Sequence, residues 1–250
     1  MDAAGRVVVL GCPIDPVDME EALRRCDGFV RAGGFAQHMA VNAAKLVTMQ
    51  TDREMLDITR RCALVTADGT GVVWAARVLG TPLPARVAGI DLMEELFGLA
   101  ERRGYTVYIL GAKAEVLERA VTELRRRHPA LKLAGYRDGY FGSDEDAAIA
   151  DEIRRAEPDM LFVAMSSPRK ERFLGEHGPS TGVSFAMGVG GAIDVVAGET
   201  RRAPRWMQVV GLEWLYRLLQ EPRRLVRRYA TTNLRFAYLV ARARLRSRVS

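Results

Sequence analysis

The sequence predicts an α/β protein in which a parallel β-sheet is covered by helices on both faces. Short apolar runs alternate with longer segments whose apolar residues recur every three or four positions, the pattern of strands joined by helices. The short runs are apolar at almost every position, as expected when both faces of a sheet are buried. Hydrophobic residues make up 48% of the 250 positions, which is enough for a substantial core.

The elements can be assigned in chain order. The expected strands are RVVVL (6–10), FAQHMAV (35–41), CALVT (62–66), TVYIL (106–110), LKLAG (131–135), MLFVAM (160–165) and VSFAM (183–187). Helical spacing fills the intervals, including 15–32, 90–103, 113–127 and 144–156. The strand pattern stops near residue 196, and the remainder is helical, with breaks at Pro204 and Pro222. We therefore expect an α/β domain of residues 1–196 followed by a helical appendage of residues 197–250.

The positive charge of the chain is concentrated in that appendage. Residues 201–250 contain thirteen arginines, no lysine and two glutamates, for a net charge of +11, whereas the first 200 residues carry −5. This excess predicts an anionic partner, and a membrane, a nucleic acid and a phosphorylated substrate are the alternatives.

The last helical segment is imperfectly amphipathic. Its apolar stripe consists of Leu225, Tyr229, Phe236, Val240 and Ala243. The adjacent face carries Arg224, Arg228, Arg235, Arg242 and Arg246, while Leu234 and Tyr238 lie off the stripe. The pattern fits a helix at an anionic membrane surface, and nucleic acid is the rival interpretation.

Cysteines, histidines and the N-terminal segment narrow the class further. Cys12, Cys26 and Cys62 match neither a disulfide framework nor a zinc pattern, so we expect reduced core thiols in the cytosol. The three histidines form no spaced cluster, so a histidine-bound metal is not expected. The first residues do not form an apolar segment with a basic flank and a cleavage site, so we do not expect a secreted protein, and the apolar run FAYLVA is too short to span a bilayer.

Four polar or glycine-rich segments follow expected strands. Asp68 comes after 62–66, and the other three are GAK (111–113), SSPRKE (166–171) and GVGGAID (188–194). Ligands of parallel sheets bind beyond the carboxyl ends of the strands. We therefore expect these segments to converge on one edge and form an active site there.

These motifs also have structural interpretations. Asp68 could cap the helix that follows it, although Gly69 and Gly71 favour close approach of a ligand. The cluster with Gly190 and Gly191 resembles a phosphate-cradling turn, but it lacks the full dinucleotide fingerprint and the P-loop Lys-Ser/Thr. A tight structural turn is an equal alternative at that position.

Three blocks carry a closer resemblance. They are TADGTGVVWAARVLGTPLPARVAGIDL (66–92), SSPRKE (166–171) and GVGGAIDVVAGETRRAPRWMQVVGLEWLYRLLQEPRRLVRRY (188–229). In this order and at these separations they closely resemble the WecG/TagA/CpsF glycosyltransferases, also called glycosyltransferase family 26. The resemblance extends from about residue 36 to residue 230.

The resemblance implies a Rossmann-like α/β domain with a C-terminal helical appendage that helps to complete the site. It also implies a bacterial, inverting enzyme that uses neither a metal nor another cofactor. Such enzymes transfer a sugar, typically N-acetylmannosamine or its uronic acid, from a UDP-sugar donor to a polyprenyl-diphosphate-linked saccharide. The reaction serves teichoic acid, enterobacterial common antigen or capsule synthesis at the membrane. We therefore expect a cytoplasmic protein, peripheral on the inner face of the bacterial cell membrane, and a homo-oligomer is left open.

Residue roles follow from the same resemblance. Asp68 matches the carboxylate proposed as general base, which would take the proton of the attacking acceptor hydroxyl. Arg86 matches an arginine suited to the substrate or its diphosphate. Arg217, Arg224 and Arg227 match appendage arginines that could neutralise the departing UDP. The remaining expected substrate-binding residues are Asn42, Gly69, Gly71, Gly89, Lys170, Glu171, Gly190, Gly191 and Asp194.

Two positions depart from the family pattern. The family's T-x-N is Ala40-Val41-Asn42 here, and its P-x-Q-E is Pro168-Arg169-Lys170-Glu171. Lys170 could contact the UDP diphosphate or a carboxylate on an acidic sugar, or it could simply be neutralised by Glu171 at an ordinary helix start. These departures put the usual donor and acceptor in doubt.

Two other classes of function compete with an active enzyme. A catalytically weakened family member could serve as a membrane-bound scaffold, which only Ala40 and Lys170 favour. A nucleic-acid-binding protein is not expected, because the sequence has no interleaved aromatic and basic residues on a strand and no helix-turn-helix signal. Since Asp68 and Arg86 are retained, the active enzyme is favoured.

Overall fold

The computed structural model describes residues 5–204, 206–207, 213–220 and 222–246, with the side chains of 214, 217 and 222–230 outside the description. Its main sheet is parallel and has the strand order β4-β3-β8-β7-β5-β6. The strands are β3 (Ala36–Val41), β4 (Leu64–Ala67), β5 (Thr106–Gly111), β6 (Lys132–Arg137), β7 (Met160–Ala164) and β8 (Phe185–Gly188). The predicted α/β fold is confirmed, as is each predicted strand from residue 35 onward.

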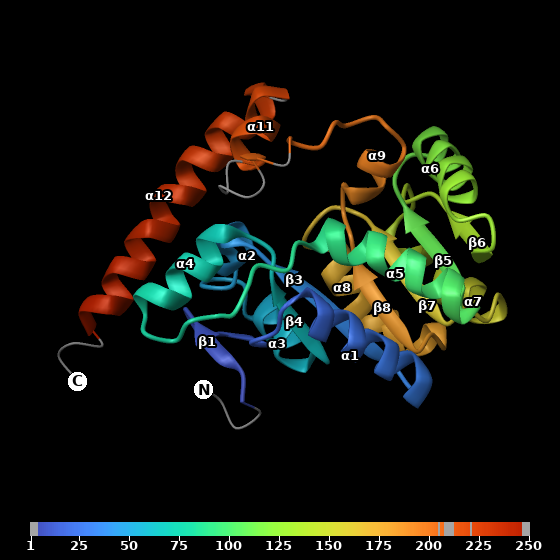
Figure 1. Ribbon diagram of the computed structural model, residues 1–250, viewed down its shortest axis with the longest axis horizontal. Coiled ribbons are helices and arrows are strands. Elements are labelled where there is room, and N and C mark those ends of the chain that lie inside the picture. The colour runs from blue at the N-terminus through green and yellow to red at the C-terminus, as the bar shows by residue number, and fades with distance from the viewer. Residues whose placement is uncertain (1–4, 205, 208–212, 221, 247–250) are drawn as a thin grey trace.

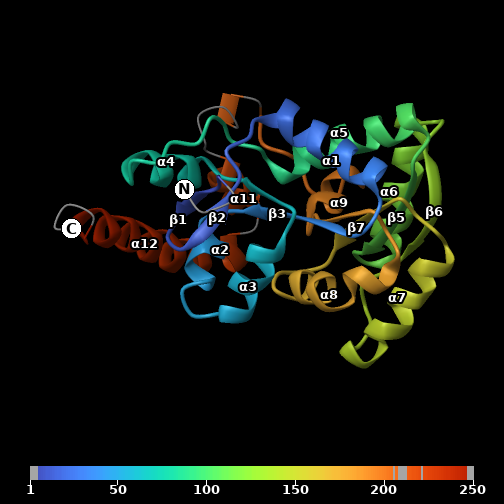
Figure 2. The ribbon, with the colours of Figure 1, turned by 90° about the horizontal axis from the view of Figure 1, so that it is seen from below.

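Helices cover both faces of this sheet (Figures 1 and 2). One layer consists of α1 (Met19–Ala32), α5 (Gly89–Arg103), α6 (Ala114–Arg127) and α9 (Ala192–Val196). The other contains α2 (Ala43–Thr48), α3 (Arg53–Arg61), α7 (Asp146–Arg155) and α8 (Arg169–His177). Along β5, Val107 and Ile109 pack into the first layer while Tyr108 and Leu110 pack into the second. Both faces are therefore buried, which explains why the strands lack polar alternation.

The N-terminal segment differs from the prediction. The expected strand 6–10 is β1 (Val7–Val9), which pairs antiparallel with β2 (Cys12–Ile14) in a separate two-stranded sheet. Leu10 and Gly11 both have positive φ, 50° and 83°, as the central residues of a two-residue hairpin turn require. The expected helix 15–32 begins only at Met19, because the Asp18 carboxylate caps it by accepting a hydrogen bond from the Glu21 N–H.

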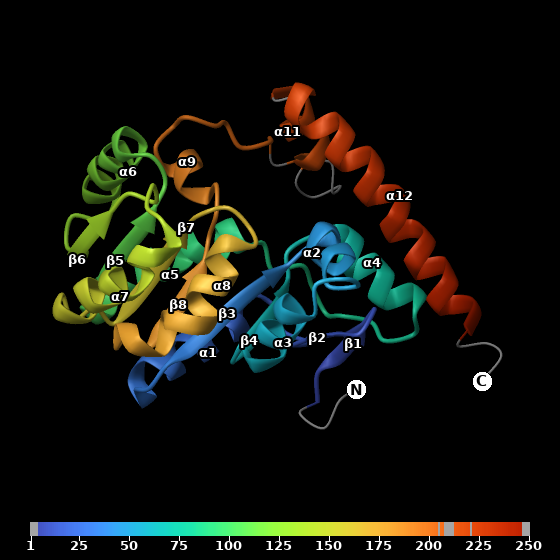
Figure 3. The same ribbon diagram turned by 180° about the vertical axis from the view of Figure 1, so that it is seen from behind.

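The described residues beyond 196 contain no strand and are helical from Glu213 to Gln220 and from Pro222 to Arg246, as predicted, whereas residues 197–204 form turns and irregular backbone. The two helices are α11 (Glu213–Gln220) and α12 (Pro222–Arg246), and α12 lies beside α2 and α4 (Thr70–Val78) (Figures 1 and 3). Phe236 and Val240 of α12 are 6% and 1% exposed and belong to the same apolar cluster as α2 and α4. This part of the appendage is therefore packed onto the α/β body.

The apolar stripe predicted to face a membrane is corrected by this packing. Phe236 and Val240 contact the protein core, so they are not available to lipid. The large apolar side chains that are exposed on the described part of α12 are instead Leu234, Tyr238 and Leu245, at 74%, 62% and 65%. Helical periodicity identified an apolar face correctly, but it could not show what covers that face. No helix among the described residues is both long and apolar enough to cross a membrane.

Candidate active site at the carboxyl edge of the sheet

The predicted convergence of loops is confirmed by the sheet topology. Strands β4, β3, β8, β7 and β5 are parallel neighbours, so the segments that follow them emerge at one edge. These segments include Asp68 after β4, Asn42 after β3, the glycine turn 188–191 at the end of β8 and the residues 166–171 after β7. Arg86 and Gly89 join them, because the Val87 N–H donates to the carbonyl of Ala67, the last residue of β4.

Asp68 links the end of β4 to the start of α5. Its Oδ1 accepts a 2.8 Å hydrogen bond from the N–H of Gly89, the first residue of α5. The alternative in which Asp68 caps the following helix is wrong, since the N-cap of α4 is Gly69 and no side chain caps it. The carboxylate is partly exposed at the sheet edge. It is therefore fixed in position and within reach of a ligand.

Ala40 packs directly against this pair. A Cβ atom at Gly89 would lie 3.3 Å from Ala40 Cβ and 3.8 Å from Asp68 Oδ1. The position where the resembling family has threonine is therefore in the immediate surroundings of Asp68. The missing hydroxyl leaves an apolar methyl group beside the candidate base.

A buried cluster of charges, formed by Lys45, Lys170 and Glu171, lies behind the edge. The Nζ atoms of Lys45 and Lys170 are 2.9 Å and 3.0 Å from the same oxygen, Glu171 Oε1. The exposed fractions of the three side chains are 10%, 8% and 2%. Burial by itself raises the pKa of Glu171, but Lys45 and Lys170 outweigh it and hold that pKa at about 2. Burial lowers the pKa of Lys170, and Lys45 lowers it further, while Glu171 and Asp68 offset part of the shift.

The glycine turn rests on the stem of Lys170. A Cβ at Gly188 would come within 2.9 Å of Lys170 Cδ, and one at Gly190 would lie 3.7 Å from Lys170 Nζ. Gly190 also has φ +55°, a conformation that favours glycine. Gly191 caps α9 without a side chain, and the Asp194 carbonyl in that helix accepts hydrogen bonds from the N–H groups of Glu199 and Thr200. Glycine is therefore required at positions 188 and 190 by packing against Lys170 and by backbone conformation, which is the structural interpretation of this turn.

Two of the expected substrate-binding residues have local structural roles. Asn42 Oδ1 caps α2 by accepting a 3.1 Å hydrogen bond from the Lys45 N–H. Gly71 faces α12, since a Cβ there would lie 3.6 Å from Phe236 Cε1. Gly69 is at the edge, 3.9 Å from Asn42 Cβ by the same measure. The loops after β3 and β4 therefore lie side by side.

Arg86 connects this edge to the appendage. Its Nη2 atom is 2.8 Å from Glu213 Oε2 on α11, and both side chains are mostly buried. Arg202 supports the same connection, with Asp91 at 2.5 Å and Glu213 at 3.8 Å. The expected site arginines Arg217, Arg224 and Arg227 lie on α11 and α12, and their side chains are outside the described part of the structure.

Sequence reasoning missed Lys45, Glu213 and Arg202 as members of this network. Lys45 carried a detectable signal, because it is the one charged residue in the apolar helix AAKLVT. The pairing of Glu213 with Arg86 spans 127 positions of sequence and had no local signal. Among the described residues, no group of three or more His, Cys, Asp or Glu side chains is arranged to hold a metal ion.

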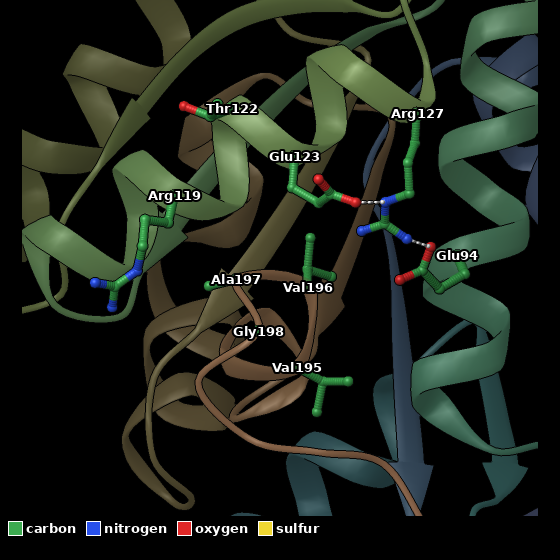
Figure 4. Close-up of a pocket in the computed structure, with 9 residues that line it drawn as sticks. All are labelled: Glu94, Arg119, Thr122, Glu123, Arg127, Val195, Val196, Ala197 and Gly198. Carbon is green, nitrogen blue, oxygen red and sulfur yellow. Dashed lines mark hydrogen bonds and ion pairs between the residues drawn. The ribbon is translucent and has the colours of Figure 1, made fainter.

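A separate groove of about 500 Å³ lies between α5, α6 and the segment around α9 (Figure 4). Arg127 lies between Glu94 and Glu123 on its wall, 2.9 Å and 3.3 Å from their carboxylate oxygens. None of the predicted site residues lines this groove. Because Arg127 is already neutralised by its neighbours, the groove is a weaker candidate than the carboxyl edge.

Comparison with known proteins agrees with the sequence motifs. A family model described as "Glycosyl transferase WecG/TagA/CpsF family" matches residues 7–250. The chain is 36% identical over 189 residues to the N-acetylglucosaminyldiphosphoundecaprenol N-acetyl-beta-D-mannosaminyltransferase of Bacillus subtilis (strain 168). That alignment covers 74% of this chain and 73% of the relative.

Proposed function

Because the chain belongs to the WecG/TagA/CpsF family of glycosyltransferases, we propose that it moves a sugar from a UDP-sugar to a polyprenyl-diphosphate-linked saccharide. The relative's name supports N-acetylmannosamine or a closely related sugar as the transferred group and a lipid-linked N-acetylglucosamine as the acceptor. The observation that carries the proposal is Asp68, a partly exposed carboxylate held by the Gly89 N–H where the loops of the parallel sheet converge.

The proposed reaction is an inverting displacement without a metal. The acceptor hydroxyl oxygen attacks the anomeric carbon, and Asp68 takes the proton of that hydroxyl. The bond between the anomeric carbon and the phosphate oxygen breaks, and its electron pair leaves with UDP. The hydrogen bond from the Gly89 N–H fixes the direction of the Asp68 carboxylate, so the base is in position before the acceptor arrives.

The leaving diphosphate needs positive charge in place of a metal. Arg86 is proposed to supply it from the α/β body, and Arg217, Arg224 and Arg227 from the appendage. The ion pair between Arg86 and Glu213 ties α11 to the segment that carries Arg86, which supports a role for the appendage at this edge. The appendage would thus complete the site rather than merely adjoin it.

Because the proposed acceptor is linked to a lipid, the enzyme would act at a membrane. We propose peripheral attachment to the inner face of the cell membrane through the arginine-rich appendage. The excess of thirteen arginines over two glutamates in residues 201–250 supports attraction to anionic lipid. Leu234, Tyr238 and Leu245, exposed on α12, would enter the headgroup region.

The test is release of UDP from a panel of UDP-sugars in the presence of a polyprenyl-diphosphate-linked acceptor. Turnover with one donor, lost in Asp68→Asn, is the expected result. The scaffold alternative, favoured by Ala40 beside Asp68, predicts instead that no donor in the panel is turned over although the protein still binds membranes. Turnover that is equal in Asp68→Asn and wild type would refute the assigned base.

A further inference from the structure

The buried charge cluster is asymmetric in its polar contacts. Lys45 Nζ has three of them, to Glu171 Oε1 at 2.9 Å, the Ala40 carbonyl at 2.8 Å and Met39 Sδ at 3.2 Å. These contacts match its three N–H donors. Lys170 Nζ has one such contact within the described residues, to Glu171 Oε1 at 3.0 Å. Two donors of a side chain that is more than nine-tenths buried are therefore left for another acceptor.

Within the cluster itself two ammonium groups share one carboxylate, and burying an ammonium without full compensation is costly. Asp68 adds a second carboxylate on the side of the sheet edge. The gap lined by Gln37, His38, Met39 and their neighbours has no interior space for a water-sized sphere. Water in that gap therefore does not satisfy the remaining donors of Lys170, and an anionic acceptor on the other side would supply the missing hydrogen bonds.

The surroundings show on which side that acceptor would lie. Lys170 is close enough to Asp68 for the carboxylate to raise its pKa. Gly190 has no side chain on the side of the ammonium, where a Cβ would be in van der Waals contact with Nζ at 3.7 Å. The ammonium is thus at the carboxyl edge, near the candidate base.

We propose that the Lys170 ammonium binds an anionic oxygen of the sugar donor and thereby sets which donors the enzyme accepts. The inference rests on the proposed function for the identity of the donor as a UDP-sugar. The oxygen belongs either to the diphosphate or to a carboxylate on an acidic sugar, and the two sources differ in which ligands they affect.

The experiment is calorimetric binding to the full-length wild type, Lys170→Gln and Lys170→Met. The probes are UDP, a UDP-linked neutral N-acetylhexosamine and the corresponding UDP-linked uronic acid. Methionine keeps a stem of similar length against Gly188, so it separates lost charge from lost packing. Lys132→Gln, which removes an exposed lysine at the start of β6, is the matched control.

A diphosphate contact predicts that both Lys170 variants bind all three probes about 10- to 100-fold more weakly. A carboxylate contact predicts the same loss for the uronic acid alone. In either case the Kd of the affected probe should depend less steeply on salt in Lys170→Met than in wild type, which a purely structural lysine would not cause. Thermal unfolding midpoints close to that of the wild type would show that the variants fold.

Wild-type affinity in both Lys170 variants for all three probes would overturn the inference and leave the proposed function intact. Failure of the wild type to bind any of the probes would refute the proposed function and this inference together.

Discussion

At the scale of single residues, Asp68 carries the clearest chemical expectation. Replacing it with Asn keeps an oxygen that can accept the Gly89 N–H, so the local structure should persist. The substitution removes the base, and turnover should fall by about 10²–10⁴-fold, the usual contribution of acid–base groups. Steady-state UDP release and the thermal unfolding midpoint, measured on the same sample, check this.

Asp57→Asn is a matched control, because it neutralises a surface carboxylate that pairs only with Arg60 among the described residues. It should keep wild-type turnover. If Asp68→Asn loses activity only in proportion to a fall in its unfolding midpoint, the role of Asp68 is structural.

The buried His38 gives the fold a dependence on pH. Its Nε2 lies 2.9 Å from Thr66 Oγ1, and its Nδ1 has no hydrogen-bond partner among the described residues. Burial, with a smaller contribution from Lys45, lowers its pKa to about 3 from an ordinary 6.5. Between these values the unfolded chain binds the extra proton, so the free energy of unfolding should fall as the pH drops from 6.5 toward 3. Glu171, with its pKa of about 2, adds a loss in the same direction below pH 4.5.

Urea unfolding at a series of pH values between 7 and 4 tests this. In His38→Gln, the free energy of unfolding should fall less steeply with decreasing pH near the upper end of this range. His177 is partly exposed, and His177→Gln should keep the wild-type dependence. A curve for His38→Gln parallel to that of the wild type would show that another group causes the loss.

Residue-scale inference from sequence succeeded where a residue's position follows from its neighbours in the chain. Asp68 and the glycine turn come directly after apolar strands, so the sheet fixes where they emerge. The shared contact of Lys45 and Lys170 with Glu171 could not be predicted, because Lys45 on α2 and Glu171 on α8 are far apart in the sequence. The pairing of Lys170 with Glu171 was foreseen as the structural alternative, but the competing Lys45 was not.

At the scale of elements, α12 has two faces with different expected roles. Phe236 is buried against Gly71, Val72 and their neighbours, whereas Tyr238 is 62% exposed. Phe236→Ala should lower the free energy of unfolding by about 3–5 kcal/mol, since it leaves a cavity. Tyr238→Ala should change it by less than about 0.5 kcal/mol. Chemical denaturation of the two variants measures the contrast, and equal effects would mean that α12 does not pack as described.

The same element shows why a truncation would test membrane binding poorly. Removing residues 222–250 would take Phe236 and Val240 out of the core as well as removing the arginines. Activity and stability would then fall together. Substitutions on the exposed face separate these effects.

At the scale of the whole molecule, the basic appendage predicts electrostatic attachment to membranes. Arg235 and Arg242 are exposed on α12. Replacing both with Gln should weaken binding to vesicles rich in phosphatidylglycerol by about 30-fold at low salt, from about 1 kcal/mol per arginine. Added salt should weaken the wild type as well, because exposed charges are screened over about 10 Å at 0.1 M.

Co-sedimentation with phosphatidylglycerol and phosphatidylcholine vesicles provides the measurement. The control Arg125→Gln/Arg126→Gln removes equal charge from the exposed end of α6 and should bind as the wild type does. Binding that resists both salt and the loss of Arg235 and Arg242 would assign attachment to the apolar residues instead.

The global architecture was largely predictable because it depends on repeating patterns. Apolar strands and amphipathic helices in alternation specify a parallel sheet with two helical layers. The hairpin of β1 and β2 escaped prediction, since Leu10 is an unusual residue for a left-handed turn position. How the appendage sits on the body also escaped it, because the contacts of Phe236 and Val240 are made with residues over 150 positions away.

The fit of Gly188 over the stem of Lys170 has a consequence for mutations at either position. Any side chain at 188 would collide with Lys170 Cδ or Cε, which the ion pair with Glu171 holds in place. A substitution at 188 would therefore require the stem of Lys170 to shift, and a shorter side chain at 170 would remove that requirement. We expect the effects of mutations at the two positions to be non-additive, because both act on the same contacts.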